Sequence, residues 1–457
     1  MATAVARTRG AGRAAAVAAL LACAVTLIFA YLNKARCAGA PFDEDGRSLV
    51  FDRVKDAEVC YSDIQFLWLG RGIDEHLFPY ISGGITPDGT LTGGAVEYPV
   101  LSGLLMWLGA AGANDDAAFL LHSALLLAPF ALLTAWMLGR MSGAVALLWS
   151  VGPPLVLYAF HNWELPVVCT AVGAVYVVTV LTRYSLRTRG IMAAILLGIG
   201  FCLKLYPGIF VLPLLLYVLL GEPDFDGESH ADVPRRGYDP LGALAAAGAA
   251  LATVVAINLP FALLGYDGWR ASFTFQQMRQ ADITTNSIWY WGLRPMFAAG
   301  DGGEASFQEV VSAASPILVV ASFVLAMWLG WKRFPALSSY PWVGVSGAML
   351  CGFLLFHKVH SPQYTLWVLP FFVLLEVPWS AIGAYLLADL ALGIGVFRYF
   401  YALGSGTAAD LDEKLVQIGV WGRAILLVFF FFAFVRARPR GYRPMVSPPA
   451  RVLVPAR

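Results

Sequence analysis

The feature that most constrains the fold is a series of long apolar runs that follow one another along the chain. The first run, about 14–32, can cross a bilayer, because ~20 helical residues span the hydrocarbon core. Only 13% of the 457 residues are charged, whereas a soluble chain has about 25%. We therefore predict an all-α polytopic membrane protein with about 12 transmembrane helices. The other predicted spans are about 117–138, 142–160, 162–182, 190–204, 207–220, 240–264, 311–331, 340–356, 363–376, 379–399 and 415–435.

Basic residues set the predicted orientation, because Lys and Arg are enriched in cytoplasmic loops. Both ends of the chain are then inside, and 33–98 forms a long first extracytoplasmic loop. If 99–112 also crossed, every later basic segment would lie outside, so we predict an interfacial or re-entrant helix there. The basic residues that fall on the predicted inner side are Arg140, Arg183, Arg187, Arg189, Arg235, Arg236, Lys332, Arg333, Arg436, Arg438 and Arg440.

The first run is predicted to be a retained anchor, because it is longer than the apolar part of a usual signal peptide. Cleavage after Ala38-Gly39-Ala40 is the alternative. One transmembrane domain covers 1–436, and 437–457 is a basic, Pro-rich cytoplasmic tail that we expect to be disordered. We expect multi-pass insertion in the plasma (inner) membrane. The net charge of +1 gives no sign of nucleic-acid binding, and oligomeric state cannot be read from the sequence.

The six cysteines contain no C-x-x-C pair, so they suggest neither a zinc site nor a redox motif. Cys37 and Cys60 lie in the same predicted outer loop and could form a disulfide in an oxidising compartment. Two free thiols are the alternative. The remaining cysteines lie in apolar runs and are interpreted as packing residues.

A mixed set of acids, imidazoles, cations and amides falls on the predicted outer side. Buried ionisable groups in a membrane domain are costly and usually functional. His357, Lys358 and His360 bring three potentially cationic groups together, which suits an anion such as phosphate. The other members are Asp63, Asp74, Glu75, His76, Glu97, His161, Asn162, Trp163, Glu164, Lys204, Tyr206, Arg279, Asn286, Gln363 and Tyr364.

Several of these residues also allow a structural interpretation. Asp63 could be a solvated loop acid, and Glu97 could cap the helix after Pro99. His161 and Trp163 could be interface anchors, and Lys204 could extend to the membrane surface without binding anything. The polar run 276–286 could be a plain loop or could hydrogen-bond sugar hydroxyls.

Five short motifs in this order resemble those of the GT-C superfamily of glycosyltransferases. More narrowly, they resemble the actinobacterial family-87 polyprenyl-phosphate-mannose-dependent mannosyltransferases, over nearly the whole chain. The motifs are Tyr61-Ser62-Asp63-Ile64, Glu97-Tyr98-Pro99, Phe160-His161-Asn162-Trp163-Glu164, Lys204-Leu205-Tyr206-Pro207 and Lys358-Val359-His360-Ser361-Pro362-Gln363-Tyr364. The family's Tyr-Pro-Pro is Tyr98-Pro99-Val100 here, which suggests a different subgroup.

The resemblance implies a donor sugar on polyprenyl phosphate and a glycolipid or glycan acceptor in the cell envelope. Mannose is the sugar it implies, and arabinofuranose is an alternative. Asp63 would be the catalytic base of an inverting displacement, with no metal or cofactor required. The leaving phosphate would be held by Lys204, His357, Lys358, His360 and Arg279. Substrate-binding residues would be Glu97, Tyr98, His161, Asn162, Trp163, Tyr206, Gln363 and Tyr364.

Two rival functions remain at this stage. A transporter or flippase of lipid-linked sugars would place its site near the bilayer midplane, often between internal repeats, and no repeat is evident. A non-enzymatic membrane scaffold would tolerate replacement of the outer acids and of the 357–360 cluster.

Overall fold

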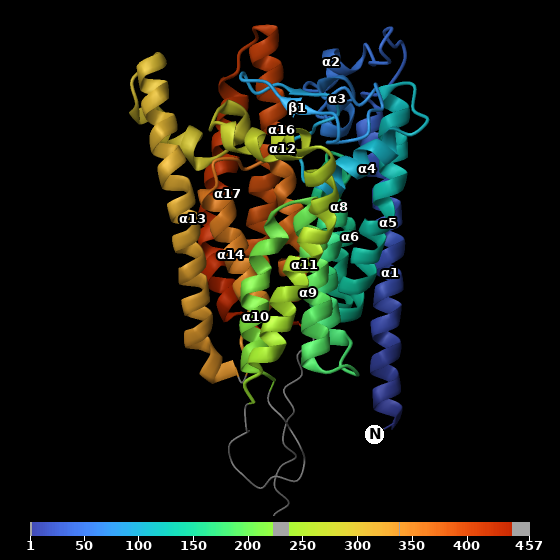
Figure 1. The fold of residues 1–457 in the computed structure, drawn as a ribbon, viewed down its shortest axis with the longest axis vertical. Coiled ribbons are helices and arrows are strands. Elements are labelled where there is room, and N and C mark those ends of the chain that lie inside the picture. The colour runs from blue at the N-terminus through green and yellow to red at the C-terminus, as the bar shows by residue number, and fades with distance from the viewer. Residues whose placement is uncertain (1, 223–236, 338, 441–457) are drawn as a thin grey trace, which may run out of the picture.

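The structure is a computed structural model of the chain and describes residues 2–222, 237–337 and 339–440, with side chains from residue 12 onward (Figure 1). It is 74% helical, which confirms an all-α polytopic membrane protein. Most of the acidic segment 221–239 and of the predicted tail 437–457 lies outside the described residues.

The described residues form seventeen α-helices joined by short helical turns. These are α1 (Ala2–Ala35), α2 (Phe51–Val54), α3 (Asp63–Gly70), α4 (Val100–Ala110), α5 (Asp116–Ser142), α6 (Leu147–Val151), α7 (Pro153–Tyr158), α8 (Glu164–Val180), α9 (Leu186–Leu203), α10 (Val211–Leu220), α11 (Pro240–Leu264), α12 (Tyr266–Met278), α13 (Asp301–Leu337), α14 (Trp342–Phe356), α15 (Thr365–Leu374), α16 (Trp379–Ser405) and α17 (Asp410–Arg436). The turns are η1 (Gly143–Ala146), η2 (Tyr206–Phe210), η3 (Ile283–Thr285), η4 (Trp289–Leu293), η5 (Arg294–Met296) and η6 (Pro362–Tyr364). Strands β1 (Gly84–Ile85) and β2 (Leu91–Thr92) pair antiparallel as a small hairpin.

Seven helical segments among the described residues are long and apolar enough to cross a membrane, so the chain is multi-pass. They are Gly12–Ala35, Asp116–Val151, Leu186–Leu203, Pro240–Leu264, Asp301–Leu337, Trp379–Ser405 and Asp410–Arg436. Four further predicted spans coincide with shorter apolar helices, namely Glu164–Val180, Tyr206–Leu220, Trp342–Phe356 and Pro362–Leu374. Length and composition alone therefore support seven crossings rather than the predicted count of about 12.

The prediction of one continuous span over 142–160 is wrong. Gly143 ends α5 with φ +63°, a conformation that favours glycine. Gly152 is extended and is followed by two prolines, so α7 begins anew at Pro153. The segment is therefore built from η1, α6 and α7 rather than from one helix.

Close helix packing gives the bundle its core. Helices α16 and α17 pack along their length, as do α9 with α11 and α1 with α5. A Cβ added at Gly419 of α17 would lie 2.5 Å from Cβ of Leu392 in α16, so only glycine permits this approach. Such small-residue contacts replace the hydrophobic driving force that is absent between helices in lipid.

One end of the bundle is covered by the first loop and by two short helices. Figure 1 shows α2, α3, the β1 region, α4 and α12 at the end opposite the N-terminus. Helix α4 confirms a helix at about 100–111. Leu67 and Trp68 of α3 are only 2% exposed, so this helix packs these apolar side chains against the rest of the protein. The first loop is a folded layer that packs on the helix ends.

Residues predicted to share the inner side meet in the structure. Arg187 pairs with Asp239 at 2.6 Å, and Arg189 pairs with Glu222 at 2.6 Å. Arg333 Nη2 donates to the carbonyl of Arg436 at 3.2 Å. The arginine-rich turns and the polar site residues are thus separate groups.

Candidate active site

The Asp63 carboxylate is held by one side-chain hydrogen bond to each of its oxygens. The Tyr61 hydroxyl donates to its Oδ1 at 2.9 Å, and Asn162 Nδ2 donates to its Oδ2 at 2.7 Å. The backbone N–H of Asp63 donates to the carbonyl of His161 at 2.8 Å, which ties α3 to the turn between α7 and α8. The side chain keeps 22% exposure, and each oxygen has further acceptor capacity. Asp63 is therefore oriented by the protein while one edge stays accessible, unlike a freely solvated acid.

His161 supports this carboxylate as a neutral group. Burial is the largest effect and lowers the pKa of His161 to about 4, although the nearby Asp63 charge opposes this. Its Nδ1 lies 3.1 Å from the Tyr61 carbonyl, which can only accept, so Nδ1 carries the proton. Its Nε2 is 3.9 Å from Asp63 Oδ2, which is too far for a hydrogen bond. His161 thus orients the Tyr61 segment.

Asn162 and Tyr98 connect Asp63 to Lys204. The same Asn162 Nδ2 donates to the Tyr98 hydroxyl at 2.8 Å. The ring of Tyr98 in turn faces the Lys204 ammonium, with Nζ 5.3 Å from the ring centroid. Four residues predicted separately from sequence are therefore brought into one connected row.

Lys204 lies in an aromatic cage. Its ammonium is 5.4 Å from the Tyr364 ring and 5.5 Å from the Trp367 ring, and it donates to Glu164. Burial lowers the pKa of Lys204, but the Glu164 charge and hydrogen bond outweigh it and the net pKa is raised. Trp367 Nε1 donates to the other Glu164 oxygen at 2.5 Å. The alternative that Lys204 reaches the surface without a partner is wrong, and its charge is already balanced by a buried carboxylate.

Arg279 and Lys358 form a basic pair just after the C-terminal ends of α12 and α14. Lys358 Nζ reaches the carbonyl of Gln277 at 3.4 Å. Burial, and then the positive charge of Arg279, lower the pKa of Lys358. Among the residues that the structure describes, no carboxylate pairs with either cation. The pair is a positive site without a counter-charge.

Burial favours the neutral form of both imidazoles in the predicted phosphate cluster. His357 stacks on Phe353 with centroids 4.7 Å apart, and burial lowers its pKa. His360 is 7% exposed, and burial lowers its pKa well below the usual value. The expectation of three positive charges at 357–360 is therefore reduced to one, that of Lys358.

Glu97 has a structural partner. Arg71 Nε and Nη2 donate to its two oxygens at 2.7 and 3.1 Å, a bidentate pair. Pro99 is the N-cap residue of α4 and no side chain caps that helix, so the helix-cap alternative for Glu97 is wrong. The pair fixes the end of the first loop rather than offering a free acid to a substrate.

Trp163 and Tyr206 are packed in the interior. Trp163 is 1% exposed and lies against Tyr98, with centroids 6.0 Å apart. His161 is buried as well, so the interface-anchor alternative is wrong for His161 and for Trp163. Tyr206 stacks on Trp367 at 4.2 Å and so supports the cage from below.

A small apolar pocket lies between α8, η2, α14 and α15. Two of its lining residues, Tyr206 and Trp367, also support or form the Lys204 cage. The remaining lining residues are Val168, Ala171, Val172, Val175, Phe210, Trp342, Ser346, Pro370, Phe371 and Leu374. An apolar surface therefore adjoins the cage.

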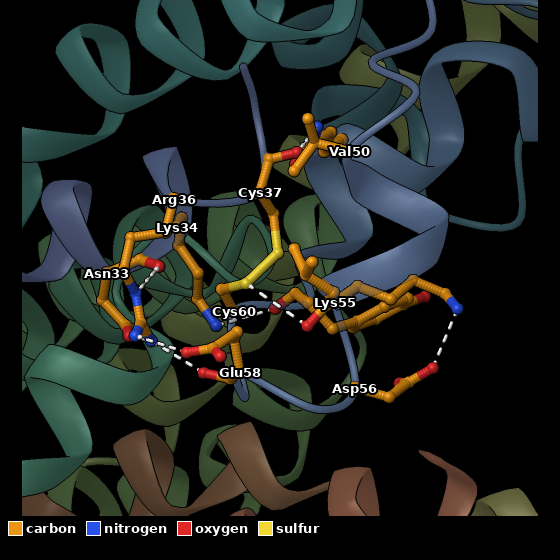
Figure 2. The surroundings of a disulfide bond; sticks show 12 residues. Asn33, Lys34, Arg36, Cys37, Val50, Lys55, Asp56, Glu58 and Cys60 are labelled. Carbon is orange, nitrogen blue, oxygen red and sulfur yellow. Dashed lines mark hydrogen bonds and ion pairs between the residues drawn. A yellow bond between two sulfur atoms is a disulfide. The ribbon is translucent and has the colours of Figure 1, made fainter. Parts of the chain in front are cut away.

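A disulfide joins Cys37 to Cys60 (Figure 2). Beside it, Lys34 Nζ donates to the carbonyl of Tyr61 at 2.7 Å, and Arg36 pairs with Glu58 at 3.3 Å. Lys34 is 2% exposed although it ends α1. These contacts fix the segment that carries Tyr61 to the first helix. No pattern in the sequence pointed to this role of Lys34.

Sequence reasoning also missed a buried ion pair. Arg423 Nη1 of α17 lies 3.3 Å from Asp389 Oδ1 of α16, and both residues are 1% exposed. Thr365 donates to the same oxygen and directly follows η6. In the sequence this pair was visible only as one acid, Asp389, and one arginine, Arg423, each within an apolar run. The pair anchors the segment that carries Gln363 and Tyr364.

Comparison with protein families gives one match. A family model described as Mannosyltransferase (PIG-M) matches residues 167–433, more than half of the chain. No curated protein sequence matches. Lys204, Arg279 and the 357–364 segment lie within the matched region. Asp63, Tyr98 and Asn162 precede it, so their assignment depends on the geometry.

Proposed function

The chain belongs to the mannosyltransferase (PIG-M) family, and from this membership we propose that it transfers mannose from polyprenyl-phosphate mannose to a cell-envelope glycolipid or glycan. Family membership favours a membrane glycosyltransferase over a transporter or a scaffold. The resemblance to the family-87 enzymes supports a polyprenyl monophosphate as the carrier of the sugar.

The observation that carries the proposal is the held but accessible carboxylate of Asp63. In the proposed step the acceptor hydroxyl oxygen attacks the anomeric carbon while Asp63 takes the hydroxyl proton. The bond from the anomeric carbon to the phosphate oxygen breaks, and the polyprenyl phosphate leaves as an anion. The product has the anomeric configuration opposite to that of the donor, because attack and departure occur on opposite faces.

The leaving phosphate needs positive charge, and Arg279 with Lys358 supplies it in this proposal. Their charges have no carboxylate partner among the described residues, so an anion there relieves repulsion and gains charge-assisted hydrogen bonds. Lys204 lies nearer to Asp63 and is balanced by Glu164. Lys204 therefore affects the shape and the electrostatic potential of the site more than the net charge of the site.

The apolar surface beside the cage is the proposed contact for the first isoprene units of the donor. The lining of this surface is almost wholly apolar, and it shares Tyr206 and Trp367 with the cage. A lipid tail against this surface would bring the phosphate and sugar to the level of Lys204 and Tyr364.

We place the active site at the extracytoplasmic face of the plasma membrane. Counting the four shorter apolar helices and the broken segment of α6 and α7 as further crossings gives twelve. The arginine-rich turns then lie inside, as the positive-inside rule requires. Retention of the first helix is supported by its packing on α5 and by the Lys34–Tyr61 hydrogen bond.

The test is mannosyl transfer by the purified protein in liposomes, with radiolabelled polyprenyl-phosphate mannose and a glycolipid extract from a deletion strain. We expect label in an envelope glycolipid that the deletion strain lacks, and none with polyprenyl-phosphate glucose. Movement of the labelled lipid between leaflets without any transfer would instead support a flippase.

A further inference from the structure

Three buried polar side-chain atoms at the outer end have no hydrogen-bond partner among the described residues. They are Asn286 Oδ1, His360 Nε2 and Gln363 Oε1. The three residues are 3%, 7% and 4% exposed. A buried polar atom without a partner is costly, so such atoms call for a ligand or ordered water.

The three residues belong to two segments that meet at one hydrogen bond. The backbone N–H of His360 donates to the carbonyl of Thr285 at 2.7 Å. Asn286 follows Thr285 in a left-handed conformation, with φ +50°, and its Nδ2 donates to the Thr284 carbonyl at 3.2 Å. The side-chain nitrogen of Asn286 is used in this bond, and the side-chain oxygen Oδ1 has no partner among the described residues.

This group lies next to the Lys204 cage. The rings of His360 and Tyr364 are stacked with centroids 6.3 Å apart, and Tyr364 is itself a wall of the cage. On the other side, His360 is two residues from Lys358 of the basic pair. The group therefore lies along the chain of contacts that runs from Asp63 through Lys204 toward the basic pair.

The chemistry of the three atoms excludes phosphate and fits a sugar. Two of them are amide oxygens, which only accept hydrogen bonds, and a phosphate dianion has no hydrogen to offer. Burial keeps the His360 imidazole neutral, so it adds no positive charge. Sugar hydroxyl groups can both donate and accept, and so they can satisfy all three atoms.

We propose that Asn286, His360 and Gln363 form the subsite that binds the hydroxyl groups of the donor hexose. The inference rests on the proposed function and assigns His360 to the sugar rather than to the phosphate. It also gives the 276–286 segment, through Asn286, a direct contact with substrate.

The test compares two lipids on the same purified protein in nanodiscs, polyprenyl-phosphate mannose and polyprenyl phosphate without a sugar. Asn286→Gly keeps the left-handed backbone and removes the side chain. Gln363→Met keeps the volume and removes the amide. Each variant should bind the mannosylated lipid about five- to tenfold more weakly, the effect of one lost hydrogen bond, and the sugar-free lipid unchanged. Gln417→Ala, at an exposed glutamine of α17 outside the site, is the matched control and should alter neither affinity.

Three other outcomes would overturn the inference. Unchanged affinities in both variants would mean that the three atoms bind only water. An equal loss for both lipids would mean that the segments act on the phosphate or on folding, and melting temperatures of the two variants separate these causes. Failure of the unaltered protein to bind the mannosylated lipid would contradict the proposed function itself, and this subsite with it.

Discussion

The acidic and basic ends of the site are built in opposite ways. At the acidic end, both oxygens of Asp63 accept hydrogen bonds, from Tyr61 and Asn162. At the basic end, Arg279 and Lys358 have no carboxylate partner in the described part of the chain. The difference teaches that the protein itself orients the base, whereas the cations remain free for an anion that arrives with the substrate.

The same contrast extends to rigidity. The acidic end is tied to α1 by the disulfide and by Lys34, and to the turn before α8 by the Asp63 backbone. A preoriented base avoids the cost of reorganisation during the reaction. Changes at the acidic end should therefore affect the rate, and changes at the basic end should affect donor binding.

Asp63→Asn should give the largest effect. The amide keeps the shape of the carboxylate but cannot take the acceptor proton, so transfer should fall by about 10³-fold or more. The rate is measured with saturating donor in a single-turnover assay. Glu75→Gln changes an exposed acid of the same loop and should leave the rate unchanged. Normal turnover in Asp63→Asn would remove the proposed base.

Arg279→Ala combined with Lys358→Ala should raise the donor dissociation constant by about 10²-fold. Each charged hydrogen bond to phosphate is worth about 1.5–3 kcal/mol, and the two losses need not add fully. Donor affinity is measured at low and high salt, and its salt dependence should weaken in the double variant. Lys332→Ala, a cation of α13 near Trp328, is the control for charge alone. Unchanged donor affinity would place the phosphate elsewhere.

Asn162→Ala should lower the transfer rate about tenfold, because it removes one of the two bonds that orient Asp63 and frees Tyr98. Tyr98→Phe removes only the hydroxyl that accepts from Asn162 and should lower the rate less. Single-turnover rates of the two variants rank these contributions. If Tyr98→Phe were the slower enzyme, the row from Asp63 to Lys204 would need another explanation.

Removal of the disulfide should lower stability before it lowers activity. Closing a loop of this length stabilises a fold by about 3 kcal/mol in the chain-entropy account. The Cys37→Ser, Cys60→Ser double variant should therefore melt at a lower temperature in detergent. Reducing agent should lower the melting temperature of the unaltered protein to that of the variant, and should not change the variant. Equal melting temperatures throughout would contradict this role.

The smallest predicted effect is a pH dependence of stability from His161. Its folded pKa, about 4, lies below its unfolded value of about 6.5, so the unfolded state binds the proton first on acidification. The stability from the neutral imidazole is complete above pH ~6.5 and is lost as pH falls toward 4. Melting temperatures over this range should fall less steeply in His161→Gln. An equally steep fall would assign the acid sensitivity to other groups, such as His360.

Much of the bundle could be predicted from the sequence because apolar runs determine where helices lie. Helices α5, α9, α11 and α17 cover the expected ranges within several residues. The separation of the arginine-rich turns from the polar site residues could also be predicted, because basic residues mark one side of a membrane protein. The break at Gly152 was overlooked because apolar composition alone hides a Gly-Pro-Pro step.

The partners within the site could not be predicted. Glu97 pairs with Arg71, and Lys204 pairs with Glu164 across 40 positions of sequence, which only the folded chain reveals. The neutrality of His357 and His360 depends on burial, and burial is a property of packing rather than of residue type. The unpaired oxygen of Asn286 likewise follows from a single left-handed residue.

The most direct test measures donor binding and mannosyl transfer together, on one protein altered at the acidic end and one altered at the basic end. We predict that Asp63→Asn binds polyprenyl-phosphate mannose as the unaltered protein does and fails to transfer the sugar. The Arg279→Ala, Lys358→Ala variant should bind the donor poorly and should still transfer the sugar from the donor that is bound. Equal loss of binding in both proteins, or transfer by Asp63→Asn, would contradict this division between base and anion site.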